Sequence, residues 1–185
     1  LNLTPDSFHD GGVWGKPDAA LKQAERMLEE GADMLDLGAQ STRPGAQRVG
    51  ANAEWQRLEP VLVALKKAQP HAILSVDTFH AEVARRALAE GADVINDVSG
   101  GDADPDMWNV VAQARAPYVL MHMQGTPTTM QDNPNYHDVV HDVVTHLQRR
   151  VHAAYQAGVT DLVADVGFGF GKTLAHNYAL LDALD

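Results

Sequence analysis

The sequence predicts an α/β fold in which parallel strands alternate with helices, and three observations indicate it. Residues 30–33 and 90–93 both read Glu-Gly-Ala-Asp, and residues 157–161 read Ala-Gly-Val-Thr-Asp. Each phrase follows a segment with helical spacing of its apolar residues, and glycine suits the left-handed position just past a helix end. Short apolar runs follow each phrase, as expected of buried parallel strands. We therefore expect either a closed (β/α)₈ barrel or an open, doubly wound sheet.

The expected elements follow one another in six βα units. We expect strands that end near Leu3, Gly38, Asp77, Asp97, Met123 and Gly167, and helices over 17–30, 53–68, 80–90, 105–115, 137–157 and 174–185. No Pro/Ser-rich linker interrupts them, so we expect a single domain over residues 1–185. A complete TIM (β/α)₈ barrel takes about 250 residues, so about six of its eight units are expected here.

Composition excludes several classes of function. The chain has 185 residues, a formal net charge of −11 and no cysteine. Proteins that bind nucleic acid gain most of their affinity from contacts of Lys and Arg with phosphate groups. A chain as acidic as this one is therefore a poor candidate for nucleic-acid binding. Without cysteine there is no disulfide framework, thiolate nucleophile or cysteine-based zinc site, and no apolar run approaches the roughly 20 residues of a membrane span. We expect a cytoplasmic protein without membrane or nucleic-acid partners.

Nearly every expected strand ends in a side chain that forms hydrogen bonds. These residues are Asn2, Asp36, Asp77, Asn96 with Asp97, His122 and Asp165. Because the carboxyl ends of parallel strands face the ligand, we expect these side chains to converge on one concave site. Carboxylates accept pairs of N–H bonds, which suits a neutral heterocycle rich in N–H donors, and a metal cluster is the alternative. The alternative without a ligand is that Asp and Asn are common where strands end, because their side chains form hydrogen bonds with the backbone of the following turn.

Two loops have features that suit an anion. Residues 41–45 read Ser-Thr-Arg-Pro-Gly, and residues 167–173 read Gly-Phe-Gly-Phe-Gly-Lys-Thr. Each combines backbone N–H groups with one cation, so each could hold phosphate. The second loop does not match the P-loop, which requires glycine where Val166 stands. A plain glycine-rich turn from strand to helix is an equally good interpretation of that loop.

Together these motifs resemble the dihydropteroate synthase family of pterin-binding barrels over the whole chain. Residues 2–8 with 10–12 resemble the first loop of the family, and residues 41–45 resemble its second loop. Residues 75–78, 95–101, 121–125 and 167–173 resemble the later strand ends in the order found in the family. The resemblance implies that 4-aminobenzoate displaces diphosphate from 7,8-dihydropterin-6-ylmethyl diphosphate, with Mg²⁺ on the leaving group.

The resemblance also implies roles for individual residues. The predicted catalytic residues are Arg43, Asp77, Asp165 and Lys172. The predicted pterin-binding residues are Asp77, Asn96, Met121 and Asp165. The residues predicted to bind aminobenzoate and diphosphate are Asp6, Phe8, Thr42, Arg43, Pro44 and Phe170. Asn2 is the predicted ligand of Mg²⁺, for which an amide oxygen is a suitable hard donor.

The chain departs from the family pattern at three places. Gln40 stands where the family usually has Glu, and Val166 stands where it commonly has Pro. The family also carries a Lys after its seventh strand and an Arg and a His near its eighth, and we expect this chain, as a barrel truncated at its C-terminal end, to lack all three. Two alternatives to the synthase remain, a pterin-binding protein without synthase activity and a pterin-dependent corrinoid methyltransferase. A homodimer is the candidate assembly.

Overall fold

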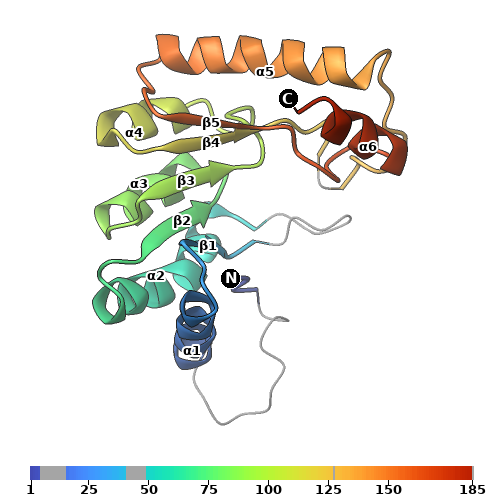
Figure 1. The fold of residues 1–185 in the computed structure, drawn as a ribbon. Helices are drawn as coiled ribbons and strands as arrows, with labels where there is room; N and C mark the ends of the chain where they lie inside the picture. The colour runs from blue at the N-terminus through green and yellow to red at the C-terminus, as the bar shows by residue number, and fades with distance from the viewer. Residues whose placement is uncertain (5–15, 41–48, 127, 185) are drawn as a thin grey trace.

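A computed structural model describes residues 1–4, 16–40, 49–126 and 128–184, and these residues form one parallel sheet with helices along it (Figure 1). The strands are β1 (Met34–Gly38), β2 (Ile73–Asp77), β3 (Val94–Asp97), β4 (Tyr118–Met121) and β5 (Leu162–Asp165). The helices are α1 (Lys16–Glu29), α2 (Ala51–Ala68), α3 (Ala81–Ala89), α4 (Met107–Ala114), α5 (Val139–Gln156) and α6 (Leu174–Asp182).

The sheet has the order β1-β2-β3-β4-β5, so each strand pairs with the next one along the chain. A doubly wound sheet reverses its strand order at a switch point, whereas a barrel adds strands in sequence. The prediction of a barrel-type arrangement is therefore confirmed for the part of the chain that is described. The first expected strand is shorter than predicted, because it forms only an isolated parallel bridge between Asn2 and Gly38.

Glycines end three of the helices as the recurring phrase predicts. Gly31, Gly91 and Gly158 have φ values of 102°, 95° and 94°, and they follow α1, α3 and α5. These angles lie in the region that favours glycine, so the chain can leave each helix at once and enter the next strand.

The two faces of the sheet differ in burial. The outer face packs under the helices, where the alternating residues Leu35, Leu37, Leu74, Val76, Ile95 and Leu120 are fully buried. On the opposite, inner face Ile73 is 46% exposed and Val163 is 55% exposed. Side chains alternate across a strand, so the helices account for one face only. In a closed barrel the other face would be the interior.

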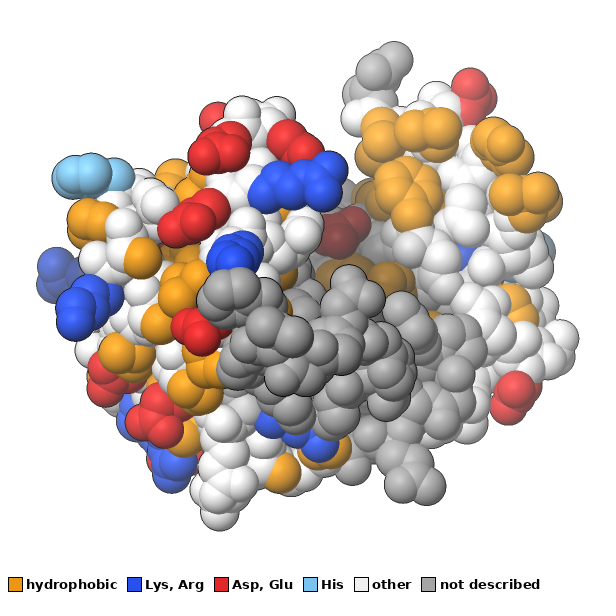
Figure 2. Space-filling view, turned by 90° about the horizontal axis from the view of Figure 1, so that it is seen from below, with side chains coloured by type: hydrophobic (Ala, Val, Ile, Leu, Met, Phe, Trp, Pro, Cys, Tyr) orange, Lys and Arg blue, Asp and Glu red, His pale blue; other side chains and the backbone are white. Residues whose placement is uncertain are grey.

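Helix α6 leaves most of its apolar side chains in solvent. Leu174, Tyr178 and Leu181 are exposed, and Leu180 is the buried residue of this helix. Figure 2 shows apolar side chains gathered at the end of the molecule where α6 lies. Within the described residues, no helix is both long and apolar enough to cross a lipid bilayer.

Candidate active site

Polar side chains gather on the inner face near the carboxyl ends of β1, β2 and β3. In the register of the sheet Asp36 lies opposite Ser75, and Asp77 lies opposite Asn96. Paired residues and residues two apart share a face, so all four side chains lie on the inner face. Asp36 Oδ1 accepts a hydrogen bond from Ser75 Oγ at 2.6 Å, and Asp36 Oδ2 accepts one from Asn96 Nδ2 at 3.2 Å. The structure thus brings together Asp77 and Asn96, with Asp36 beside them.

The Asp77 carboxylate is the group of this cluster whose charge is most disfavoured. Burial, followed by the negative charges of Asp36, Glu54 and Asp97, raises the pKa of Asp77 to about 8. Gly38 of β1 lies opposite Asp77, and a Cβ atom there would be in van der Waals contact with Asp77 Oδ2 at 3.4 Å. A partly buried carboxyl group with a perturbed pKa at the end of a strand is a candidate ligand-binding group.

Asp165 lies at the end of β5, opposite Met121 of β4. Its Oδ1 accepts a hydrogen bond from the backbone N–H of Gly167 at 2.8 Å, which orients the carboxylate at the start of the glycine-rich turn. The register pairs Asn96 with Val119, two residues before Met121, so the Met121 thioether and the Asp165 carboxylate lie on the same inner face as Asn96. All four predicted pterin-binding residues therefore share one face of the sheet, at the carboxyl ends of their strands.

A small apolar cluster lies beside these polar groups. Phe79, Val98 and Met121 are buried together, and Met123 and Phe170 pack against them. The sequence analysis included Met121 and Phe170 but missed Phe79 and Val98. Both follow a polar strand-end residue by two positions, Asp77 and Asn96 respectively, and this spacing is the signal that could have identified them.

The glycine-rich turn after β5 is held by Lys172. Its side chain is almost fully buried, and Nζ donates to the carbonyl oxygens of Gly167 at 2.9 Å and Phe170 at 3.0 Å. Nζ also lies 3.0 Å from His122 Nδ1. Burial lowers the pKa of Lys172 to about 8, and the charge of Asp165 opposes that effect. The ammonium group thus ties the turn together, and its role in catalysis stays a prediction.

Two of the expected strand-end residues do not face the site. Burial, then the charges of Lys172 and His146, lowers the pKa of His122 to about 4, and His122 packs edge-on against His146 of α5. Asp97 is fully buried and follows Asn96 directly, so it faces the helices. The expectation that all these side chains converge is wrong for His122 and Asp97.

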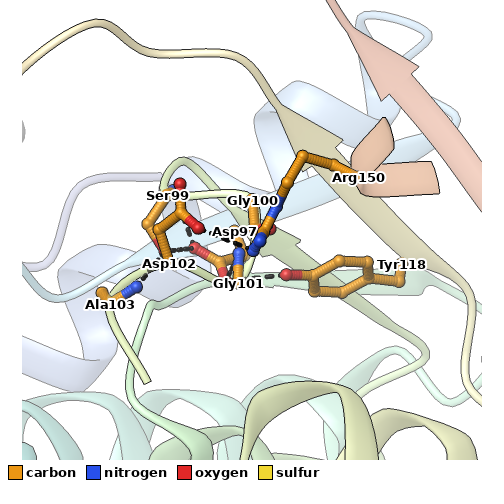
Figure 3. Close-up of polar contacts among 8 residues, drawn as sticks. All are labelled: Asp97, Ser99, Gly100, Gly101, Asp102, Ala103, Tyr118 and Arg150. Carbon is orange, nitrogen blue, oxygen red and sulfur yellow. Dashed lines mark hydrogen bonds and ion pairs between the residues drawn. The ribbon is translucent and has the colours of Figure 1, made fainter. Parts of the chain in front are cut away.

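Asp97 instead organises the loop that follows β3 (Figure 3). Its carboxylate accepts hydrogen bonds from Tyr118 Oη at 2.7 Å, from the backbone N–H and Oγ of Ser99 and from the N–H of Gly101. Arg150 of α5 donates twice to the Gly100 carbonyl and forms an ion pair with Asp102. These bonds fix the backbone on the outer side of the strand whose inner side carries Asn96.

The two predicted loops fall largely outside the described residues. Asp6, Phe8, Thr42, Arg43 and Pro44 all belong to that part of the chain, and their placement is not described.

Gln40 lies at the edge of the second of these segments. Its Nε2 donates to Glu54 Oε2 at 2.9 Å, and its Oε1 accepts from the N–H of Val49 at 3.0 Å. Glu54 is fully buried, and its Oε2 also lies 2.7 Å from His80 Nδ1. A Glu at position 40 would place a second carboxylate against Glu54, so the neutral amide fits this environment.

Asn2 is exposed at the bridge to Gly38. Its Oδ1 accepts a hydrogen bond from the N–H of Thr4 at 3.0 Å, and an amide oxygen has a second lone pair for another partner. Among the described residues, no three His, Asp or Glu side chains lie close enough together to hold a metal ion. Asn2 can therefore contribute one oxygen ligand, and a bound diphosphate would have to contribute others, as is common for Mg²⁺.

Comparison with known proteins adds independent information. The family model of pterin-binding enzymes matches residues 1–185. Dihydropteroate synthase of Haemophilus influenzae is 44% identical over 100% of this chain and 67% of its own length. The mitochondrial folate synthesis bifunctional protein of Arabidopsis thaliana is 46% identical, and the match covers 98% of this chain and 34% of that protein.

Solved structures agree with these relatives. Dihydropteroate synthase of Xanthomonas albilineans with 4-aminobenzoic acid has a TM-score of 0.91 at 48% identity, covering 99% of this chain and 65% of that chain. The Yersinia pestis dihydropteroate synthase with a sulfonamide drug complex has a TM-score of 0.91 at 44% identity, and the match covers 100% of this chain and 67% of that chain. The chain thus spans about two thirds of these bacterial proteins and a smaller share of the plant protein. It belongs to the family of pterin-binding enzymes that includes dihydropteroate synthase.

Proposed function

We propose that this protein is a dihydropteroate synthase, which joins 7,8-dihydropterin-6-ylmethyl diphosphate to 4-aminobenzoate and releases diphosphate. The observation that carries the proposal is the shared inner face of Asp77, Asn96 and Asp165, with Met121 beside them. The 4-aminobenzoate bound to the Xanthomonas relative and the 7,8-dihydropteroate bound to another structure of that enzyme support the same substrates here.

The proposed pterin site matches the chemistry of the ring. A dihydropterin carries an amino group and ring N–H groups along its edges, and carboxylates are acceptors when ionised. Asp77 and Asp165 would accept these N–H bonds, and Met121 would pack on the flat face of the ring. Phe79, Val98 and Phe170 surround Met121 with apolar surface, which would exclude water from the reacting methylene group.

The proposed reaction needs no covalent nucleophile from the protein. The amine nitrogen of 4-aminobenzoate forms a bond to the methylene carbon, the carbon–oxygen bond to diphosphate breaks, and the amine loses a proton. Mg²⁺, when bound, would stabilise the negative charge that grows on the leaving diphosphate. Asn2 would hold this ion with one oxygen, and Arg43 would contact the diphosphate. Phe170 would form a wall of the aminobenzoate site, together with Asp6, Phe8, Thr42 and Pro44.

The two alternatives differ in what they require. A corrinoid methyltransferase would use the pterin carboxylates but not an aminobenzoate site, and the named relatives with high coverage are dihydropteroate synthases. A pterin-binding protein without synthase activity would keep the inner-face residues and lack turnover. The cytoplasmic location and the homodimer stay predictions.

The test of the proposed function is release of diphosphate in the presence of both substrates and Mg²⁺. Asp165→Asn should lower kcat/KM by about 30-fold or more. The NH₂ group of the new amide would face the N–H donors of the ring, so a hydrogen bond between protein and ring would be lost. His141→Gln is the control, since His141 is exposed on α5, and this variant should stay within about twofold of wild type. Pterin binding by the wild-type chain without turnover would favour the pterin-binding alternative.

A further inference from the structure

The Asp36 carboxylate of β1 forms hydrogen bonds with side chains of β2 and β3 on the inner face. The proposed reaction assigns no function to it. Asp36 lies on β1 and Asn96 on β3, with β2 between them. The short side chain of Ser75 on β2 lets the Asn96 amide reach Asp36 Oδ2 at 3.2 Å, while Ser75 Oγ occupies Asp36 Oδ1 at 2.6 Å.

The contact with Asp36 determines whether the NH₂ group or the oxygen of the Asn96 amide faces the Asp36 carboxylate. An ionised carboxylate only accepts hydrogen bonds, so it must meet the NH₂ end of the amide, and the opposite orientation would place two oxygens against each other. The chemistry of the pair therefore assigns the orientation, which atom positions alone do not. Asn96 keeps its second N–H and its Oδ1, and no other hydrogen bond of this side chain is found within the described part of the chain.

We propose that Asp36 is a positioning residue of the pterin site, which fixes the amide of Asn96 so that the pocket selects one order of donor and acceptor on the edge of the heterocycle. The inference rests on the proposed function and deepens it. With the amide fixed, Asn96 offers one acceptor and one donor in a set order. Such a pair matches an edge with an amino group next to an unprotonated ring nitrogen, as in pterin.

Lumazine provides a ligand of nearly the same shape with the reverse order. It has a carbonyl oxygen where pterin has the 2-amino group, and an N–H where pterin has the neighbouring ring nitrogen. A free amide can turn to pair with either edge, but an amide held by Asp36 pairs only with that of pterin. Asp36 therefore acts on selectivity, because a site built to pair with one pattern leaves polar groups unpaired against the other.

The experiment is to measure the Kd of pterin and of lumazine for wild type and for Asp36→Asn, by fluorescence titration. The amide at position 36 can meet either end of Asn96, so the preference for pterin over lumazine should fall by about tenfold or more. Ser75→Ala is the matched control, because it removes the other hydrogen bond to Asp36 and leaves the contact with Asn96. This control should keep the wild-type preference, whereas loss in both variants would show a structural effect only and overturn the inference.

The outcomes separate this inference from the proposed function. Binding of pterin by wild type with an unchanged preference in Asp36→Asn would overturn the role of Asp36 alone. Failure of wild type to bind pterin would overturn the proposed function and this inference with it. Should Asp36→Asn not fold, scalar coupling across the hydrogen bond between the Asn96 side-chain nitrogen and the Asp36 carboxyl carbon tests the contact in wild type by NMR. We expect this coupling, and its absence would contradict the inference.

Discussion

Replacing Asp77 with Asn should stabilise the folded chain at pH 8 and at the same time weaken pterin binding. The pKa of Asp77 rises from 3.8 to about 8 in the folded protein, so the folded state holds a proton over a range in which the unfolded chain has released it. The folded state then binds more protons, and stability falls as the pH rises from about 4 to about 8. Asn has nearly the same shape and no charge, so it should escape this loss.

The expected gain grows with pH, and its pH dependence is what identifies its cause. Each unit of pKa shift corresponds to about 1.4 kcal/mol, and the shift from 3.8 to about 8 spans about four units, so the variant should be more stable than wild type by ~5 kcal/mol at pH 8 and nearly equal to it at pH 4. Thermal unfolding at several pH values measures the difference. Asp161→Asn is the control, because this carboxylate is exposed and its removal should change stability by less than about 0.5 kcal/mol at either pH.

Above pH 8, where Asp77 is ionised, the same variant should bind pterin about 30-fold more weakly, since an amide has one oxygen acceptor where the carboxylate has two. A residue that lowers stability in order to bind a ligand is expected at a functional site. Wild-type affinity in Asp77→Asn, or a stability difference that does not depend on pH, would contradict the role given to this carboxylate.

Replacing Gly167 with Ala should destabilise the chain by about 3 kcal/mol, from a left-handed backbone penalty and a steric clash. Gly167 has a φ of 68°, and a Cβ there would collide with the carbonyl oxygen of His122. Because the Gly167 N–H donates to Asp165 Oδ1, relief of the clash would also move that carboxylate. The variant should therefore lose both stability and pterin affinity.

Gly169→Ala is the matched control for this prediction. Gly169 has a φ of 81°, and a Cβ there would meet nothing within 4 Å. It should lose only the backbone term of about 1 kcal/mol. Chemical denaturation of both variants measures the two costs, and equal losses would show that the approach of Gly167 to His122 is not what the turn depends on.

Helix and strand order could be predicted from the sequence because local signals determine them. Glycine at the helix ends and short apolar runs placed all five strands and six helices of the described part within a few residues of their bounds. The first strand was overestimated, because two residues around Asn2 carry too little pattern to distinguish a strand from a bridge.

Side-chain direction was predicted less well than position. Asn96 and Asp97 are neighbours on β3, so one faces the inner side and the other faces the helices, and only the register shows which. The partners of Lys172 are backbone carbonyls of its own turn and the ring of His122, and no residue pattern reveals such partners. The contact of Asp36 with Asn96 likewise depends on β1 and β3 flanking β2.

A crystal structure of the chain with bound pterin tests the central claim most directly. The ring should lie at the carboxyl ends of β2, β3 and β5, with its N–H groups within hydrogen-bond distance of Asp77, Asn96 and Asp165 and its face against Met121. A pterin found elsewhere, such as the groove on α5 lined by His141, Asp142 and Arg149, would contradict the account.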